Sequence, residues 1–163
     1  MKQKKIYYHS VAVFVKNMDR SKEFYTGILD QDMDRDFGKN IILKSGISLW
    51  EVNPSHIIPK RLGDESINNE KAVRFELYFE TDDVESVFRK LKENNVGFLH
   101  PIHEEPWGQK TIRFFDPDRH LIEIGESMET FVVRLAKDMT PEQVSEKTSV
   151  PLSVVEKIIS HKS

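Results

Sequence analysis

The sequence predicts an α+β fold in which one β-α-β-β-β unit occurs twice. The evidence is the order of the predicted elements, which is the same in two stretches that start roughly 65 residues apart. A polar stretch separates the two units, and a helical tail follows the second. The chain has 163 residues, a length that suits one domain with a small appendage.

The elements of the first unit are visible in its local composition. Residues 6–15 are rich in aromatic and β-branched side chains, which favours a strand. Asn17 and Asp19 offer helix-start chemistry, and apolar residues at helical spacing predict a helix over 21–29. Three further strands, separated by turns that contain glycine, are predicted at 32–37, 40–44 and 47–52.

The pattern restarts after residues 54–69, a polar stretch with two prolines that is interpreted as a linker. Residues 73–80 predict a strand, and Thr81-Asp82-Asp83 predicts the cap of a helix over 84–94. The remaining strands of the second unit are predicted at 98–103, 110–115 and 120–125.

The tail carries the signals of three helices. Apolar spacing predicts one over 130–137, and capping boxes at Thr140 and Ser153 mark two more. The last two have the spacing of a helix-turn-helix, but Pro151 and the residues after it offer few groups that could contact bases or phosphates. We therefore expect the tail to pack on its own domain or on a dimer partner, and not to bind nucleic acid.

Composition argues against several functional classes. The 24 basic and 27 acidic residues give a net charge of −3, so no positive excess predicts binding to nucleic acid or to an anionic membrane. The chain has no cysteine, which excludes disulfides, thiolate metal sites and cysteine nucleophiles. It has no apolar run of about 18 residues for a membrane span and no signal-peptide pattern near its start. These features predict a soluble cytoplasmic protein.

The most informative motif is the segment Asp116–Glu123. Asp116-Pro117-Asp118 is typical of a tight turn, and Glu123 follows it inside a predicted strand with apolar neighbours. An ionised glutamate is seldom buried without a partner. Glu123 is therefore either an edge residue in water or a ligand or catalytic group that faces a cavity.

Together with the helix start Met18–Tyr25, this motif resembles the glyoxalase / bleomycin-resistance / extradiol-dioxygenase group, the vicinal oxygen chelate superfamily. Arg119 stands where that motif usually has glycine, a residue suited to a turn with positive φ. The resemblance implies two modules that form a curved mixed sheet around a cavity, and it implies a homodimer. The boundaries that follow are 1–127 for the domain, with modules at about 5–53 and 72–127, and 128–163 for a helical extension.

The same resemblance implies a divalent metal, Ni, Zn, Mn or Fe, held by side chains from several strands. Glu123 falls at the last ligand position, and Glu76 falls where a histidine ligand is common. His9 looks like the opening ligand, but counting back from the helix start places Ser10 in register, and a slip of one residue turns a strand side chain to the other face. The fourth-strand position has two candidates, Ser48 and Glu51.

Candidate substrate contacts lie between two strands of the second unit and in the strand that follows. Trp107 offers a large apolar face, and Gln109 offers both a donor and an acceptor. Arg113 could fork onto a substrate oxyanion, or it could instead neutralise Glu76 and Glu123. The histidines without metal-binding spacing, interpreted as surface residues, are His56, His100 and His103.

Two functions are compatible with these residues. In the first, the protein is a glyoxalase-like lyase or isomerase in which a divalent metal on Glu76, Glu123 and His9 stabilises an enolate or oxyanion while a carboxylate moves a proton. In the second, it is a metal-free binding or resistance protein whose carboxylates contact a cationic ligand or pair with Arg113. The partner is a small molecule in both, and the second needs no cofactor.

Overall fold

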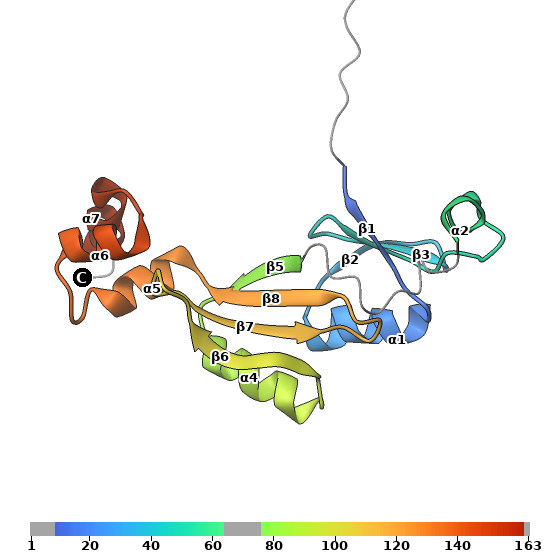
Figure 1. The fold of residues 1–163 in the computed structure, drawn as a ribbon, viewed down its shortest axis with the longest axis horizontal. Coiled ribbons are helices and arrows are strands. Elements are labelled where there is room, and N and C mark those ends of the chain that lie inside the picture. Colours follow the sequence, from blue (N-terminus) through green and yellow to red (C-terminus); the bar gives the residue numbers. More distant parts are fainter. Residues whose placement is uncertain (1–8, 64–75, 162–163) are drawn as a thin grey trace, which may run out of the picture. The chain divides into compact units, whose positions relative to one another are not determined.

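The computed structural model describes residues 9–63 and 76–161, which form two compact units (Figure 1). The first unit contains Met1–Ala72 and the turn Pro117–Arg119, and the second contains Val73–Asp116 and His120–Ser163. Each unit has its own four-stranded mixed sheet. The predicted α+β fold with a doubled βαβββ order is therefore confirmed.

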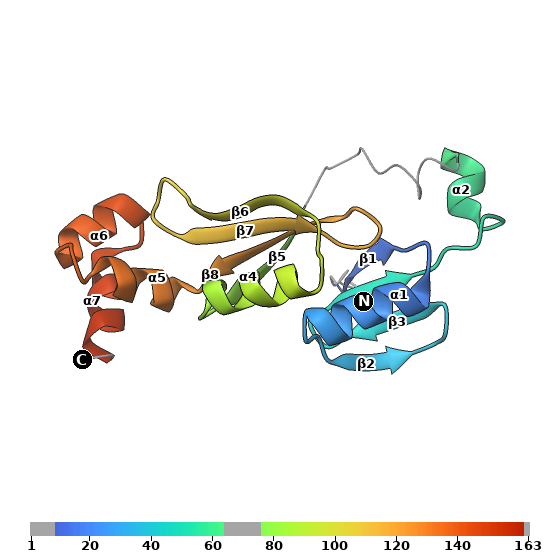
Figure 2. The same ribbon diagram turned by 90° about the horizontal axis from the view of Figure 1, so that it is seen from below.

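The first unit contains β1 (Val11–Phe14), α1 (Met18–Glu23), η1 (Phe24–Ile28), β2 (Met33–Asp36), β3 (Asn40–Leu43) and β4 (Ile47–Trp50). Its strand order is β1-β4-β3-β2, with β1 parallel to β4 and the other neighbours antiparallel (Figure 2). Asn17 caps α1 by accepting a hydrogen bond from the backbone N–H of Arg20, and the helix continues into the π-helical turn η1. Buried Tyr25 and Leu49 belong to the core of this unit.

A short helix, α2 (Ile57–Leu62), lies within the stretch 54–69 that the composition predicts to be a linker. This helix is not among the elements predicted from the sequence, and residues 64–69 lie outside the described residues. His56 caps the helix by accepting from the N–H of Ile58, and Gly63 ends it with a φ of +84°. A cap and a terminating glycine are local signals that a count of polar residues does not detect.

The second unit contains β5 (Glu76–Thr81), α4 (Val84–Glu93), β6 (Phe98–Glu104), β7 (Lys110–Phe115) and β8 (Leu121–Glu126). Its strand order is β5-β8-β7-β6, and α4 lies along one face of the sheet (Figure 2). Buried Ile112, Phe114 and Ile122 lie on the face that α4 covers, as does Leu91 of the helix itself. The side chains between them on β7 and β8 point to the opposite face.

The turn between β7 and β8 has the backbone conformation that its motif predicts. Arg119 has a φ of +71°, the left-handed region that favours glycine. The carboxylate of Asp116 accepts a hydrogen bond of 2.8 Å from the backbone N–H of His120 and lies 2.8 Å from the Nδ1 of its ring. These contacts fix the start of β8, the strand that carries Glu123.

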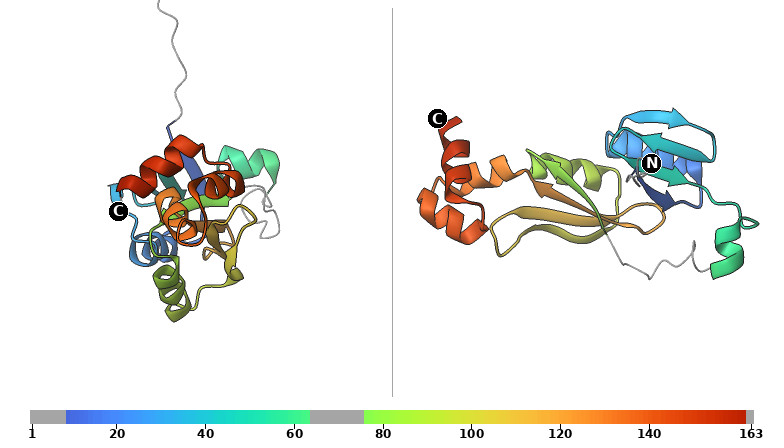
Figure 3. Two further views of the ribbon diagram at one scale, coloured as in Figure 1. Left: turned by 90° about the vertical axis from the view of Figure 1, so that its left-hand side faces the viewer. Right: turned by 90° about the horizontal axis from the view of Figure 1, so that it is seen from above.

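The tail folds into three helices, α5 (Met128–Leu135), α6 (Pro141–Thr148) and α7 (Leu152–His161) (Figure 3). They share an apolar cluster made of Phe131, Val132, Leu135, Val144, Val150 and Val155. The capping box at Thr140 is present, whereas the box predicted at Ser153 is wrong because α7 already includes that residue. Among the described residues, no helix is long and apolar enough to cross a membrane.

Candidate functional site

One face of the second sheet, opposite α4, gathers most of the polar residues singled out from the sequence. Arg113 on β7 is the cross-strand partner of Glu123 on β8, and Tyr78 on β5 is aligned with Glu123 from the other side. Glu76 lies two residues before Tyr78 and therefore shares this face. We call it the polar face; its members are Glu76, Tyr78, Glu105, Trp107, Gln109, Thr111, Arg113 and Glu123.

The guanidinium of Arg113 contacts three carboxylates. Its Nε donates to Oε2 of Glu76 at 3.0 Å, its Nη1 donates to Oε1 of Glu105 at 2.8 Å, and its Nη2 forms an ion pair with Glu123. Nη1 also lies 3.3 Å from Nε2 of His100. Burial opposes the charge of Arg113, but the hydrogen bonds to Glu105 and Glu76 outweigh it, so the pKa of Arg113 is raised.

Glu123 is the most buried of the three carboxylates, with 4% of the residue exposed. Its Oε2 accepts no well-oriented hydrogen bond from the described residues, so the Arg113 guanidinium is the main compensation for its charge. Burial raises the pKa of the Glu123 carboxyl to about 7, while Arg113 lowers it and Glu76 raises it. Glu123 therefore exchanges a proton near neutral pH, where general acid–base chemistry works best.

The second half of the polar face is held by Gln109. The Nε2 of Gln109 donates to the hydroxyl of Tyr78 at 2.9 Å and to the backbone carbonyl of Glu126 at 2.7 Å. Its Oε1 accepts a hydrogen bond of 3.2 Å from the indole Nε1 of Trp107. Gln109 is buried, whereas Tyr78 and Trp107 are 48% and 41% exposed. Two aromatic rings are thus fixed by one amide and remain open to a ligand.

Gly125 on β8 leaves the space that Gln109 occupies, and we expect Gly125→Ala to be destabilising by about 1–3 kcal/mol. A Cβ at this position would lie 2.6 Å from Nε2 of Gln109 and 3.2 Å from the hydroxyl of Tyr78. Because the hydrogen bonds of Gln109 fix its amide, the side chain cannot move away without losing them. Urea unfolding would measure the effect, and Gly97→Ala is the control because nothing lies within 4 Å of a Cβ there. Equal stability of the two variants would contradict this prediction.

The remaining sequence candidates lie in the first unit. His9 and Ser10 both precede β1, where His9 is exposed and Ser10 is half-buried. Ser48 on β4 is buried and donates to the side-chain oxygen of Asn40. The structure thus places these three residues in a different unit from Glu76 and Glu123.

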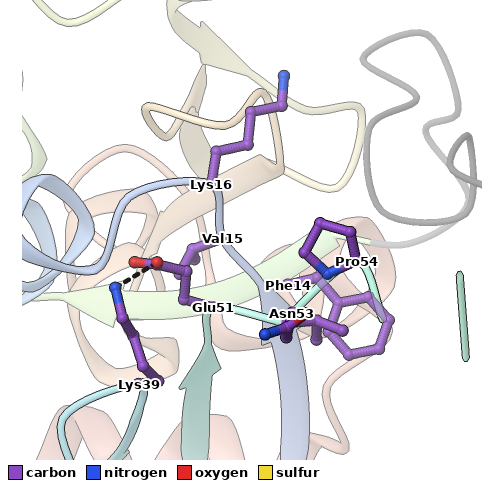
Figure 4. Close-up of a pocket in the computed structure, with 8 residues that line it drawn as sticks. Phe14, Val15, Lys16, Lys39, Glu51, Asn53 and Pro54 are labelled. Carbon is purple, nitrogen blue, oxygen red and sulfur yellow. Dashed lines mark hydrogen bonds and ion pairs between the residues drawn. The ribbon is translucent and has the colours of Figure 1, made fainter. Parts of the chain in front are cut away.

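Glu51 lines a hollow of about 320 Å³ in the first unit (Figure 4). Its Oε2 accepts a hydrogen bond of 2.8 Å from the backbone N–H of Met18, and its Oε1 pairs with Lys39. The hydrogen bond from Lys39 is the larger cause of the lowered pKa of Glu51, and the Met18 N–H adds to it. In this arrangement Glu51 stabilises the start of α1 as a charged carboxylate.

A divalent metal does not fit Glu76 and Glu123 as they are arranged. Arg113 already bonds to both carboxylates, so a metal ion, which needs several of their oxygens as direct ligands, would have to displace the guanidinium. Over residues 9–63 and 76–161, no three His, Asp or Glu side chains are grouped so that they could hold a metal ion. The arrangement instead favours chemistry that uses the charges of the protein itself.

Glu105 and His100, which both contact Arg113, were given no role from the sequence. Glu105 lies in the turn between β6 and β7, and its carboxylate also accepts a hydrogen bond of 3.1 Å from Thr111. His100, interpreted as a surface residue, is half-buried beside Arg113. The pairing of β6 with β7, which aligns His100 with Arg113, is the signal that could have found it.

Comparison with known proteins identifies the fold family of this arrangement. The sequence model of a glyoxalase-like domain matches residues 8–129. A protein of unknown function from Agrobacterium tumefaciens str. C58 is 30% identical, with a TM-score of 0.60, over 78% of this chain and 98% of that one. No curated protein matches the chain.

Two more distant structures share the fold. One is a glyoxalase/bleomycin resistance protein/dioxygenase from Nocardioides, 17% identical with a TM-score of 0.57, over 77% of this chain and 85% of that one. The other is a lactoylglutathione lyase from Agrobacterium tumefaciens, 19% identical with a TM-score of 0.52, over 78% of this chain and 96% of that one. At this identity, the likeness concerns the fold alone.

Proposed function

The chain belongs to the glyoxalase/bleomycin resistance/dioxygenase superfamily, and from this premise we propose that it binds a small organic cation without a metal. The observation that carries the proposal is the Arg113 guanidinium set among three carboxylates. Three negative charges and one positive charge leave −2 when all are ionised, and −1 when Glu123 is protonated. Arg113 and the three carboxylates therefore keep a net negative charge throughout the physiological pH range, which attracts a positively charged ligand.

The exposed aromatic rings define the second feature of the ligand. Trp107 and Tyr78 share the polar face with the carboxylates, and both keep about half of their surface open. Aromatic faces attract cations and also cover apolar groups. We infer a ligand that joins an amine or amidine to an aromatic or aliphatic body.

The first experiment is elemental analysis of the purified, untagged protein after incubation with Ni, Zn, Mn and Fe salts. We expect no stoichiometric metal, because the carboxylates are already paired with Arg113. The companion variants are Glu76→Ala and Glu123→Ala. A stoichiometric metal in the wild type that is lost in both variants would overturn the proposal in favour of a metal-dependent lyase or isomerase.

The second experiment measures binding of three isosteric probes by calorimetry at pH 8. We expect benzamidine to bind, and neutral benzamide and anionic benzoate not to bind, because only benzamidine carries a positive charge. Glu76→Gln should weaken benzamidine binding about threefold to tenfold, the usual effect of one lost hydrogen bond. Glu93→Gln, on the exposed part of α4, is the control. Benzamide binding as tight as that of benzamidine would contradict recognition by charge.

The raised pKa of Glu123 favours a second candidate function, proton transfer at a carbon next to a carbonyl. A carboxylate that titrates near pH 7 can take up and return a proton, and Arg113 beside it can stabilise a developing oxyanion. Exchange of the carbon-bound protons of dihydroxyacetone in deuterated water, followed by NMR, would detect this activity. It should be absent in Glu123→Gln, and equal exchange in both proteins would exclude a role for Glu123.

A further inference from the structure

The loop that carries Trp107 is anchored by a residue of the C-terminal helices. Arg134 on α5 donates from Nη2 to the backbone carbonyl of Gly108 at 2.5 Å and to Oε2 of Glu126 at 2.7 Å, and its Nε donates to Oε1 of Glu126 at 2.9 Å. Glu126 is buried, and its Oε2 also accepts from the backbone N–H of Lys110. One guanidinium therefore joins α5 to the end of β8 and to the β6–β7 loop.

Further hydrogen bonds link Glu126 to Gln109 and Trp107 on the polar face. The backbone carbonyl of Glu126 accepts from Gln109, and Gln109 accepts from the indole of Trp107. Arg134 thus connects to Trp107 in two ways, through Glu126 and Gln109 and through the carbonyl of Gly108, the next residue in the chain. A change at Arg134 would reach Trp107 without a direct contact between the two side chains.

The loop is also fitted closely against α5. Gly108 has a φ of +93°, and a Cβ built on it would lie 2.8 Å from a methyl carbon of Leu135 and 3.0 Å from Cε of Lys147. Only glycine meets both demands, the left-handed backbone and the missing side chain. The β6–β7 loop and the C-terminal helices therefore pack so closely at Gly108 that no side chain fits between them.

We propose that Arg134 is a positioning residue through which the C-terminal helices hold Trp107 and Gln109 in place on the polar face. Arg134 and the rest of the chain after it lie beyond the glyoxalase-like match, which ends at residue 129. The extension is thus an addition to the family domain that shapes one part of its surface. The consequence for ligand binding rests on the proposed function, whereas the placement of Trp107 does not.

The test uses the full chain labelled with 5-fluorotryptophan and observed by 19F NMR without a ligand. The protein has two tryptophans, Trp50 and Trp107, and Trp107→Phe assigns their signals. We expect Arg134→Gln to shift and broaden the Trp107 signal and to leave the Trp50 signal, in the other unit, unchanged. Arg134→Lys should have a smaller effect, because an ammonium keeps the charge but not the planar fork. Lys137→Gln, which removes an exposed charge from the same tail, is the control and should change neither signal.

The outcomes separate this inference from the proposed function. An unchanged Trp107 signal in folded Arg134→Gln would overturn the inference, and if that variant does not fold, an unchanged signal in Arg134→Lys would do so. In the same variants, benzamidine binding should weaken roughly threefold to tenfold, as for a lost or displaced hydrogen bond. A shifted Trp107 signal in a protein whose wild type does not bind benzamidine would support the positioning role and refute the choice of ligand.

Discussion

Arg113→Met is expected to destabilise the protein by about 2–4 kcal/mol at pH 8, because it leaves three carboxylates without the guanidinium between them. Glu123 is affected most, since its Oε2 is buried and has no well-oriented hydrogen bond from the described residues. The loss should shrink toward pH 5, where the carboxylates take up protons that relieve their repulsion. Chemical unfolding at both pH values would measure the change.

Two further variants show whether charge is the cause. Arg113→Lys should recover part of the loss, because an ammonium keeps the charge but cannot reach three carboxylates in one plane. Arg113→Met combined with Glu123→Gln should be more stable at pH 8 than Arg113→Met alone, since the most buried negative charge is gone. If the second substitution brings no recovery, the cost of losing Arg113 comes from packing and not from electrostatics.

Arg113→Met also tests the reason given for the poor fit of a metal. The variant presents Glu76, Glu105 and Glu123 without the guanidinium, and carboxylate oxygens of this kind suit Mn²⁺. We expect Mn²⁺ to draw the three side chains into the space that the guanidinium leaves, and so to stabilise this variant and not the wild type. Equal effects of Mn²⁺ on both proteins would show that Arg113 does not control access of a cation to these residues.

The fold was predictable because both modules carry strong local signals. The strand at 110–115 agrees with β7, and the helix at 84–94 agrees with α4 to within one residue. Helix α2 was not predicted because it depends on two end residues, His56 and Gly63, rather than on an apolar stripe. The error at Ser153 arose because the capping pattern also occurs inside a helix that has already begun.

The site was predictable only in part. The alternation of side chains along a strand shows which residues share a face, but it does not show which side chains from other elements contact them. The pairing of Glu123 with Arg113 follows from strand register, and Glu76 reaches the same guanidinium from β5. Pairing of the two carboxylates with Arg113 was one of two alternatives open from the sequence. Glu105 reaches Arg113 from a turn, and Arg134 reaches the β6–β7 loop from the tail, so neither contact has a fixed spacing in the sequence. Such contacts depend on how separate elements pack, which no local pattern encodes.

Glu123→Gln is expected to change the pH dependence of stability more than any other single substitution on the polar face. The pKa of Glu123 is about 7 in the folded protein against an ordinary value of 4.5, so the folded state binds this proton more tightly than the unfolded chain. The stability that comes from the proton is complete below about pH 4.5 and is lost as the pH rises through about 7. Glutamine keeps the shape of the side chain and cannot ionise, so the variant does not suffer this loss.

Relative to the wild type, Glu123→Gln should therefore gain about 2–3 kcal/mol of unfolding free energy between pH 5 and pH 8.5, at 1.36 kcal/mol for each pKa unit. Urea unfolding of both proteins at several pH values gives the difference directly. Glu93→Gln, an exposed position on α4, should give a difference that does not change with pH. If the curves of wild type and Glu123→Gln stay parallel over this range, Glu123 is ionised at an ordinary pKa. In that case Arg113 compensates its charge fully, and the proton-transfer candidate loses its basis.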